Sequence, residues 1–504
     1  MTTYTLRKGS PARTRTDLVV IGVARTASGD PVPCPGGEEV AEAYGRKWRP
    51  MLSSMGFKGD AGEVLRVPTA GVLKAGTLLL VGLGERDDLT LEKVRRAAGV
   101  SARSFGNAAS VAVALPAIDA AHVRAVTDGL VLGQYSYQGR KTRKSGNKSV
   151  GDVSILSDVA RRADAVAALE AGQKVGALVN RARDWVNTPP NDLTPELFAD
   201  AVKALFEEQG GNKSGLGLEV LGLTELTELG AGGILGVGQG SVNEPRLVKL
   251  TWQPKDPRAS VALVGKGITY DSGGLTIKPG SSMSTMKYDM GGAATVLAAT
   301  FAIAALELPV AVTTYAPMAE NMPSGSAMRP GDVLTMYNGK TVEVTNTDAE
   351  GRLILADALA MAVEDEPDAI VDVATLTGAA LVALGEKVAA LFGDDATTAA
   401  ISAAAETSGE MMWRLPIPEQ TVDAVRDSKI ADVLQSNWVR WGGTLYAAAF
   451  LQEFVEERPW SHIDIAGPAW NTGSSWGHVP AAATGYGIST LVEYAASLVD
   501  GAKD

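Results

Sequence analysis

The feature that most constrains the fold of this chain is a series of short apolar segments that alternates with helical patterns between residues 260 and 394. The apolar segments read SVALVGKG, LPVAVTTYAP, KTVEVTN, AIVDVATLTG and KVAALFGD, and helices are expected after Asp289 and after Arg352. Runs rich in Val, Ile and Ala are typical of strands that are buried on both faces of a mainly parallel sheet. The series therefore predicts an α/β domain whose site lies where strands end and helices begin.

A shorter series of the same kind lies in the N-terminal part of the chain. Its apolar runs, DLVVIGVA, TLLLVGLG and VAVALP, predict a smaller α/β domain. A length of 504 residues also favours two domains. We expect an N-terminal α/β domain over residues 1–157, an Ala-rich linker helix over 158–185, and a larger catalytic α/β domain with a mainly parallel central sheet over 186–504.

The composition restricts the class of protein and its partners. With 45% hydrophobic and 21% charged residues, the chain has the composition of a soluble globular protein. Its formal net charge of -12 argues against nucleic acid as a partner, because such binding rests on clustered Lys and Arg. The start MTTYTLRKGS lacks the apolar core of a signal peptide, and no stretch of about eighteen uncharged apolar residues predicts a membrane span. The expected location is the cytoplasm, away from the membrane.

The inventory of metal-binding side chains points to oxygen ligands. Cys34 is the only cysteine, which excludes an intramolecular disulfide and a thiolate metal cluster. The three histidines, His122, His462 and His478, do not supply a zinc site of the HExxH type. Any metal must therefore be held mainly by carboxylates.

The segment NTDAEGRLILADAL, at 346–359, places Asp348, Glu350 and Arg352 at every second position. In an extended segment such side chains point to the same side, so these three would converge at the end of a strand. The alternative is a helix start, because the residues from Thr347 to Glu350 fit the Ser/Thr-x-x-Glu capping box. The segment alone leaves both interpretations open.

Two other strand-to-helix connections carry similar residues. GKGITYDSGGLTIKPG, at 265–280, offers Lys266, Asp271 and Lys278 in a loop whose glycines let the backbone approach a ligand. Asp289 lies where the next helix is expected to begin, and on its own it fits an N-cap better than a ligand.

Four carboxylates would thus meet at one edge of one sheet, those of Asp271, Asp289, Asp348 and Glu350. Their mutual repulsion is costly unless cations compensate it, and two divalent ions about 3–4 Å apart would do so. Lys266 would be a counter-charge or, if a metal displaces its proton, a ligand. A solvated acidic rim with helix caps is the simpler alternative, but it does not account for Lys278 and Arg352.

Several motifs of the chain resemble, in order and spacing, those of the leucyl aminopeptidase family, the dinuclear cytosol aminopeptidases that include bacterial aminopeptidase A. NTDAEGRL resembles the family signature, and GKGITYDSGGLTIKP and MKYDMGGAA resemble its two other metal motifs. Further agreement lies in VNTPPNDLTP, VATLTGA, HIDIAGPAW and ATGYG, so the resemblance covers residues 186–490.

The resemblance implies a metal-dependent aminopeptidase, a hydrolase that acts on peptides with a free N-terminus and favours leucine. It implies two divalent metal ions, Mn²⁺ or Zn²⁺, bridged by a water molecule that attacks the peptide bond. The tighter ion would be held by Lys266, Asp271, Asp289 and Glu350, and the more exchangeable ion by Asp271, Asp348 and Glu350. Lys278 would polarise the substrate, and a bicarbonate ion at Arg352 would act as the general base.

By the same resemblance, a further group of residues would touch the substrate or the bicarbonate, namely Met286, Gly351, Thr375, Leu376 and Gly378. Met286 would equally fit the core, and ATLTGA would fit a plain strand-to-helix turn. His462 is interpreted as structural. Four tryptophans, Trp438, Trp441, Trp470 and Trp476, are interpreted as packing or rim residues, near loops that could border the substrate entrance.

The resemblance further implies a homohexamer, a dimer of trimers whose active sites face an interior cavity. A two-metal phosphoesterase is the rival enzyme, because oxygen-rich dinuclear sites also serve phosphate chemistry. The rival from a different class is a DNA-binding architectural role, which some bacterial relatives add to peptidase activity. The acidic balance of the chain disfavours it.

Overall fold

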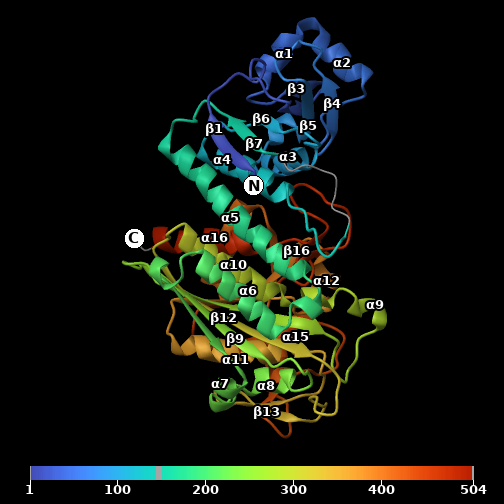
Figure 1. The fold of residues 1–504 in the computed structure, drawn as a ribbon. Helices are drawn as coiled ribbons and strands as arrows, with labels where there is room; N and C mark the ends of the chain where they lie inside the picture. Colours follow the sequence, from blue (N-terminus) through green and yellow to red (C-terminus); the bar gives the residue numbers. More distant parts are fainter. Residues whose placement is uncertain (1, 143–149, 502–504) are drawn as a thin grey trace. The chain divides into compact units, whose positions relative to one another are not determined.

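The computed structural model describes residues 2–142 and 150–501. The chain divides into two compact units. The first comprises the residues up to Asn180 together with Thr472–Ala481, and the second comprises Arg181–Asn471 together with the residues from Ala482 onward. Helix α5 (Ala163–Asn187) contributes to both units (Figure 1).

The first unit is built on a seven-stranded sheet in the order β1-β7-β6-β2-β5-β4, with β3 paired to β2. Its central strand β2 (Leu18–Arg25) runs parallel to β5 and β6. Alternate residues of β2 belong to two different apolar clusters, so both faces of the sheet are covered. The expected smaller α/β domain is thus confirmed.

The other elements of this unit are the strands β1 (Thr3–Arg7), β3 (Pro31–Pro33), β4 (Val64–Pro68), β5 (Thr77–Glu85), β6 (Ser110–Ala114) and β7 (Asp152–Leu156), and the helices α1 (Glu38–Tyr44), α2 (Trp48–Ser54), α3 (Leu91–Arg103) and α4 (Ala120–Gly133).

The second unit is built on a nine-stranded sheet in the order β17-β16-β19-β15-β10-β12-β9-β8, with β11 paired to β12. Its central strands β19, β15, β10 and β12 are parallel, whereas β9, β8 and β16 join the sheet through antiparallel pairings. The expected mainly parallel sheet is therefore confirmed. The strands are β8 (Leu216–Leu221), β9 (Arg246–Trp252), β10 (Ala259–Gly265), β11 (Gly267–Asp271), β12 (Val310–Asn321), β15 (Ala369–Ala374), β16 (Val388–Gly393), β17 (Met411–Arg414) and β19 (Trp460–Asp464).

One segment of the expected series lies outside this sheet. KTVEVTN contains β14 (Thr341–Glu343), which belongs to a small three-stranded sheet with β13 (Val333–Thr335) and β18 (Val433–Leu434). The reason is local: a tight turn at Gly339, where φ is +82°, folds the segment back antiparallel onto β13. The expectation that KTVEVTN forms a strand of the central sheet is wrong.

Further elements of this unit are the helices α6 (Pro195–Glu208), α7 (Leu223–Glu228), α8 (Gly232–Gly238), α9 (Gly280–Met283), α10 (Gly291–Ala305), α11 (Gly351–Glu364), α12 (Gly378–Leu384), α13 (Asp395–Ser408), α14 (Glu419–Val425), α15 (Gly443–Gln452) and α16 (Ile488–Gly501), the short 3₁₀ helix η5 (Met286–Met290), and the strand pair β20 (Trp470–Asn471) and β21 (Ala482–Ala483).

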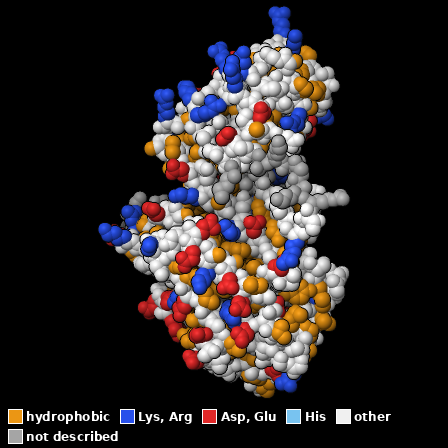
Figure 2. All heavy atoms as spheres, in the orientation of Figure 1, with side chains coloured by type: hydrophobic (Ala, Val, Ile, Leu, Met, Phe, Trp, Pro, Cys, Tyr) orange, Lys and Arg blue, Asp and Glu red, His pale blue; other side chains and the backbone are white. Residues whose placement is uncertain are grey.

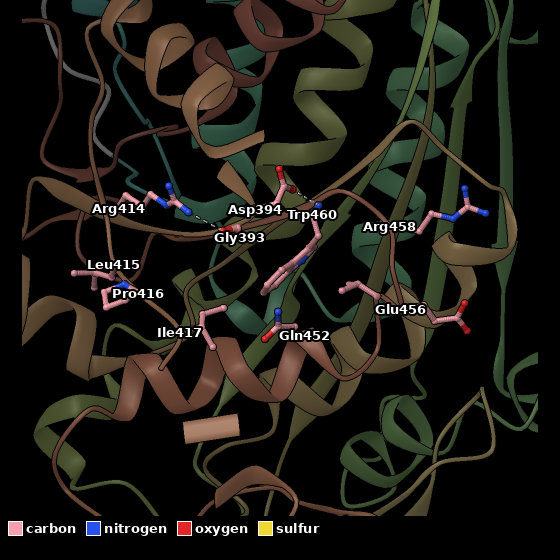
Figure 3. Close-up of a pocket in the computed structure, with 11 residues that line it drawn as sticks. Gly393, Asp394, Arg414, Leu415, Pro416, Ile417, Gln452, Glu456, Arg458 and Trp460 are labelled. Atoms are coloured by element: carbon pink, nitrogen blue, oxygen red, sulfur yellow. Dashed lines mark hydrogen bonds between the residues drawn. The ribbon is translucent and has the colours of Figure 1, made fainter. Parts of the chain in front are cut away.

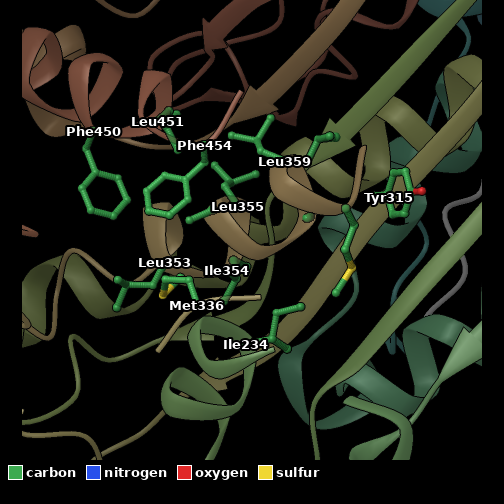
Figure 4. Packing of buried hydrophobic residues seen from close by; sticks show 14 of the residues in the cluster. Ile234, Tyr315, Met336, Leu353, Ile354, Leu355, Leu359, Phe450, Leu451 and Phe454 are labelled. Carbon is green, nitrogen blue, oxygen red and sulfur yellow. The ribbon is translucent and has the colours of Figure 1, made fainter. Parts of the chain in front are cut away.

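Two helices connect the core of this unit to the predicted site. In Figure 4, Leu355 and Leu359 of α11 lie in the same apolar cluster as Phe450 and Phe454, in and just after α15. Helix α10 is buried on all sides, with Ala305 as its only half-exposed residue. Because both helices are held by apolar packing, the residues at their N-terminal ends are fixed relative to the sheet.

The segment Met286–Ala305 is long and apolar enough to cross a membrane, judged by length and composition alone. However, 89% of its most apolar window is buried inside the protein, as expected for the core helix of a globular domain. The two units differ in the charge of the face that Figure 2 shows. Lys and Arg side chains are prominent on the first unit, and acidic side chains are prominent on the second.

Candidate metal and active site

The predicted ligand residues lie at the carboxyl ends of the central parallel strands. Lys266 follows the last residue of β10, and Asp271 is the last residue of β11. Asp289 lies in η5, and Glu350 directly precedes α11. The structure thus brings together residues that are up to 84 positions apart in the chain.

The sequence suggested two local structures for the segment with Asp348 and Glu350, a strand end and a capping box, and both are wrong. The residues from Asn346 to Glu350 form a turn and not a strand, so the side chains of Asp348 and Glu350 are not aligned by strand periodicity. Glu350 caps no helix through its side chain, and Thr347 donates its hydroxyl proton to the carbonyl of Gly273 at 2.7 Å instead of capping. We call residues 345–350 the ligand turn.

The N-cap interpretation of Asp289 is also wrong. Helix α10 begins after Met290, one residue further on, and Met290 caps it without a side-chain hydrogen bond. The carboxylate of Asp289 instead accepts hydrogen bonds from Lys266 Nζ at 2.9 Å and from Thr375 Oγ1 at 2.7 Å. The hydrogen-bond partners of Asp289 therefore lie in other segments at the edge of the sheet, and not in the helix that follows it.

Two lysines pair with the four carboxylates. Lys266 Nζ lies 2.8 Å from Asp289 Oδ2 and 2.9 Å from Glu350 Oε1, and it donates to the carbonyl of Thr375 at 3.0 Å. Lys278 Nζ lies 2.7 Å from Asp271 Oδ2 and 2.7 Å from Asp348 Oδ1. The side chain of Lys266 is 4% exposed and that of Lys278 is 16% exposed, so Lys278 is the lysine more accessible to a ligand.

The pKa values in this cluster reflect burial and mutual charge. Burial raises the pKa of Asp289 to about 6 and that of Glu350 to about 8, although the charge of Lys266 opposes both shifts. Burial alone would lower the pKa of each lysine, but the neighbouring carboxylates outweigh it and raise the pKa of Lys266 and of Lys278. Both lysines are therefore ammonium groups in the metal-free protein.

The donor set fits divalent cations. Asp271, Asp348 and Glu350 each offer one carboxylate oxygen, and these three oxygens lie within 4.8 Å of one another. Within the described part of the chain, the buried atoms Asp289 Oδ2, Asp348 Oδ1 and Glu350 Oε2 accept no well-aligned hydrogen bond, although the first two face lysine ammonium groups. Because buried carboxylate oxygens normally have partners, and hard cations prefer such oxygens, the residues present fit a metal site.

Two residues that the sequence did not single out hold this cluster in place. Asn321, the last residue of β12, donates from Nδ2 to Asp271 Oδ1 at 2.8 Å and to the carbonyl of Thr347 at 2.9 Å. Gln435 donates to the carbonyl of Ala349 at 3.1 Å, and its side-chain oxygen accepts from the backbone N–H groups of Thr345 and Asn346. Asn321 could have been found from its position at the end of an apolar strand, whereas nothing in the sequence around Gln435 marks it.

Arg352, in the first turn of α11, is buried beside the cluster. It donates from Nη1 to the carbonyl of Gln435 at 2.8 Å, and its guanidinium lies 5.9 Å from the ring centroids of Tyr446 and Phe450. Burial lowers its pKa to about 10. Its Nε–H is buried and has no partner among the described residues, so one charged donor is left to bind an anion.

Gly351 leaves space for Lys266. A Cβ atom at this position would lie 2.4 Å from Lys266 Cε, which is too close for any side chain. Glycine therefore lets the lysine keep its contacts with Asp289 and Glu350 where it passes the start of α11.

The loop after β15 borders the same site. Thr375 contacts Asp289, as described above, and the buried carboxylate of Asp464 accepts from the backbone N–H of Leu376 at 3.1 Å and from Thr377 Oγ1 at 2.7 Å. Gly378 begins α12 and is exposed. Met286 begins η5 and is half-buried, so its side chain is not part of the closed core.

His462 and the hollow drawn in Figure 3 lie outside the candidate site. His462 is fully buried, and its Nδ1 lies 2.6 Å from Asp372 Oδ1, within the sheet. A hollow of about 370 Å³, drawn in Figure 3, is lined by residues such as Asp394, Arg414 and Trp460. It lies at the start of β19, whereas Asp464 lies at the other end of that strand, so this hollow contains none of the predicted site residues.

A mainly parallel α/β domain, with carboxylates and lysines gathered at the carboxyl edge of its sheet, is suited to metal-dependent hydrolysis. Residues 180–492 match the family model described as the cytosol aminopeptidase family, catalytic domain, and residues 20–144 match that of the N-terminal domain. The chain belongs to the cytosol aminopeptidase family. It is accordingly a metal-dependent aminopeptidase, an exopeptidase that acts on peptides.

Individual relatives agree with this assignment. The chain is 46% identical to a protein of Streptomyces coelicolor named "Probable cytosol aminopeptidase", over 98% of each chain. It is 45% identical to a protein of Micrococcus luteus with the same name, over 87% of this chain and 88% of that relative. Among solved structures, the "Bottromycin maturation enzyme BotP in complex with Mn" is similar with a TM-score of 0.85 and 37% identity, over 96% of this chain and all of the other.

Proposed function

We propose that this aminopeptidase releases N-terminal residues, leucine preferentially, with two divalent ions held by the clustered carboxylates. Lys266, Asp271, Asp289 and Glu350 would hold the tighter ion, and Asp271, Asp348 and Glu350 the more exchangeable one. The observation that carries the proposal is the convergence of four acids and two lysines in one largely buried cluster. Mn²⁺ or Zn²⁺ would serve, and the similar BotP structure is a complex with Mn.

When bound, two such ions supply Lewis acidity and lower the pKa of water. The chain's own residues would do the rest. Lys278 is the more exposed of the two lysines and is charged, so it would donate a hydrogen bond to the carbonyl oxygen of the scissile bond and stabilise the charge that develops there. Lys266 is enclosed among these carboxylates, and it would bind the tighter ion as a neutral amine after the metal displaces its proton.

Arg352 would hold a bicarbonate ion, which would supply the general base. Support comes from its buried Nε–H, which has no partner among the described residues. The test is activity in carbonate-free buffer with and without added bicarbonate. We expect stimulation of the natural enzyme and none of an Arg352→Met variant; equal responses would contradict the role of Arg352.

The free α-amine of the substrate would be recognised by the acidic cluster, because its positive charge complements Asp289 and Asp348. An internal peptide bond has no such amine, which accounts for exopeptidase action. The first side chain would lie against Met286, Thr375, Leu376 and Gly378, which border the cluster on the side of η5 and α12.

The decisive experiment compares leucyl-anilide with N-acetyl-leucyl-anilide. The protein is stripped of metal with a chelator and then reloaded with Mn²⁺ or Zn²⁺. We expect metal-dependent cleavage of the free-amine substrate alone. Cleavage of neither substrate, with two metals measured per subunit, would contradict the proposal, and hydrolysis of p-nitrophenyl phosphate under those conditions would support the rival phosphoesterase.

We further propose a cytoplasmic homohexamer, a dimer of trimers. The cytoplasmic location and the hexamer are both inferred from the family to which the chain belongs. Light scattering on the purified protein measures the mass of the assembly, and a monomeric mass would refute the hexamer.

A further inference from the structure

We propose that residues 436–442, here called the tryptophan loop, bind apolar side chains of the substrate peptide on the leaving side of the scissile bond. The loop has the sequence SNWVRWG and carries Trp438 and Trp441. The inference rests on the proposed function, since it names a subsite of the same active site. It assigns the enzyme a preference for peptides that are apolar or aromatic beyond their first residue.

The first end of the loop is fixed to the ligand turn. Gln435, the residue before the loop, bonds the turn through its side chain, and its carbonyl accepts from Arg352 at 2.8 Å. The next carbonyl, that of Ser436, accepts from Thr345 Oγ1 at 2.5 Å. The loop therefore begins beside the ligand turn, which carries Asp348 and Glu350.

The second end of the loop is fixed to α12 and to the residue that holds the loop after β15. Gly443 begins α15, and a Cβ atom on it would lie 3.3 Å from Ala379 Cβ, in the first turn of α12. Thr444 lies 3.4 Å from the carboxylate of Asp464, which also holds the loop after β15. The tryptophan loop thus runs from the ligand turn to the loop that carries Thr375, along the border of the site.

The loop exposes large apolar side chains at this border. Trp438, Val439 and Trp441 are 64%, 55% and 79% exposed, and the guanidinium of Arg440 lies 5.6 Å from the ring centroid of Trp441. Trp438 also has a φ of +57°, in the left-handed region, which is energetically unfavourable for a residue with a large side chain. Exposed aromatic rings on strained backbone beside a catalytic site are typical of a ligand-binding surface.

A second apolar segment lies on the other side of the ligand turn. Leu275 and Ile277, just before Lys278, are 47% and 59% exposed. Thr276, between them, exchanges hydrogen bonds with Thr347, at 2.7 Å and 3.2 Å. Two segments with exposed apolar side chains therefore contact the ligand turn.

The occupant that fits is the peptide itself. The first side chain of the substrate is assigned to the side of η5 and α12. The tryptophan loop runs from there to the ligand turn, so the rest of the peptide would leave along this loop. A Trp side chain buries about 150–250 Å² when it is covered. Apolar peptide residues would cover this surface, whereas glycine residues would not.

The test compares two substrates in one set of variants. The ratio of kcat/KM for Leu-Phe-Phe to that for Leu-Gly-Gly is measured for the natural enzyme, for the double variant Trp438→Ser/Trp441→Ser, and for Trp413→Ser. Trp413 is a matched control, because it is 65% exposed on β17, outside the site. We expect the double variant to lower the ratio at least tenfold, mainly through KM, since each lost apolar contact costs roughly 10-fold or more. The control should keep the ratio.

Other outcomes separate the possible failures. If the double variant keeps the ratio, the inference is wrong, and a lower mass in light scattering would then identify the loop as an interface between copies of the chain. If the natural enzyme does not cleave leucyl-anilide, the proposed function itself fails. If the double variant loses all activity, the variant Trp438→Phe/Trp441→Phe decides: a ratio near that of the natural enzyme supports the inference, and a ratio lowered like the expected Ser value refutes it.

Discussion

Asn321 and Asp271 lie at the ends of two paired strands, and the amide of Asn321 donates to the carboxylate of Asp271 at 2.8 Å and to the carbonyl of Thr347 at 2.9 Å. One side chain therefore connects β11 to the ligand turn. Both groups that it serves are acceptors, so an amide is suited to this position and a carboxylate is not.

We predict that Asn321→Asp lowers activity by about 10–100-fold, the usual effect of losing a partner of a metal ligand. The added carboxylate would repel Asp271 and release the ligand turn. Metal content per subunit and kcat/KM for leucyl-anilide measure the effect. Unchanged metal content together with unchanged activity would show that Asn321 does not position the cluster.

Glu350→Gln should lower kcat by at least about 100-fold, because it removes the charge that both proposed metal sites share. Glu366→Gln is the control, since the Glu366 side chain is 78% exposed and pairs with Arg458 away from the site. Turnover within a few-fold of the natural enzyme, with both metals bound, would refute the assignment of Glu350.

The His462–Asp372 pair should make stability depend on pH. Burial alone would lower the pKa of His462, but Asp372 outweighs it and raises this pKa above its usual value of 6.5. The folded protein thus holds this proton more tightly, so the stabilisation is fully present below about pH 6.5 and is lost as pH rises through the folded pKa.

We therefore expect the thermal unfolding midpoint to fall between pH 6 and pH 9 in the natural protein, and to fall less in His462→Gln. His122→Gln, which changes a half-buried histidine of the other unit, is the control. Parallel curves for the natural protein and His462→Gln would contradict the predicted linkage.

Asp357, in the middle of α11, is fully buried and accepts hydrogen bonds from the backbone N–H groups of Ile234 and Tyr337, at 2.8 Å and 2.9 Å. Asp357→Ala would leave both donors unpaired, at a cost of about 1–3 kcal/mol each. We expect the catalytic unit to unfold at a lower urea concentration, and Asp357→Asn to lie between Asp357→Ala and the natural protein. An unchanged midpoint for Asp357→Ala would show that water or a backbone shift replaces the carboxylate.

The sequence predicted the features that depend on local pattern. Buried strands carry continuous Val, Ile and Ala residues, and Lys266 and Asp271 lie where two such strands end, so the α/β class and this part of the candidate site could be predicted from the sequence. The details that depend on distant partners were not. Asp289 and Thr347 were interpreted from their neighbours in the chain, but their hydrogen bonds go to residues 86 and 74 positions away.

Gln435 shows the same limit from the other direction. Nothing around it in the sequence marks it, yet it holds the ligand turn from 86 positions away, through the small sheet that contains β14 and β18. That sheet was itself not predicted, because a single turn at Gly339 decides whether KTVEVTN joins the central sheet or folds back on β13. Side chains that support a site are therefore found only once the topology is known.

The two lysines within the acidic cluster have a consequence for how the enzyme is made. Lys266 and Lys278 act as internal counterions, so the chain can reach its folded state before any metal arrives. We therefore expect a cell short of metal to accumulate the inactive protein, and a later supply of ions to activate this stock without new synthesis.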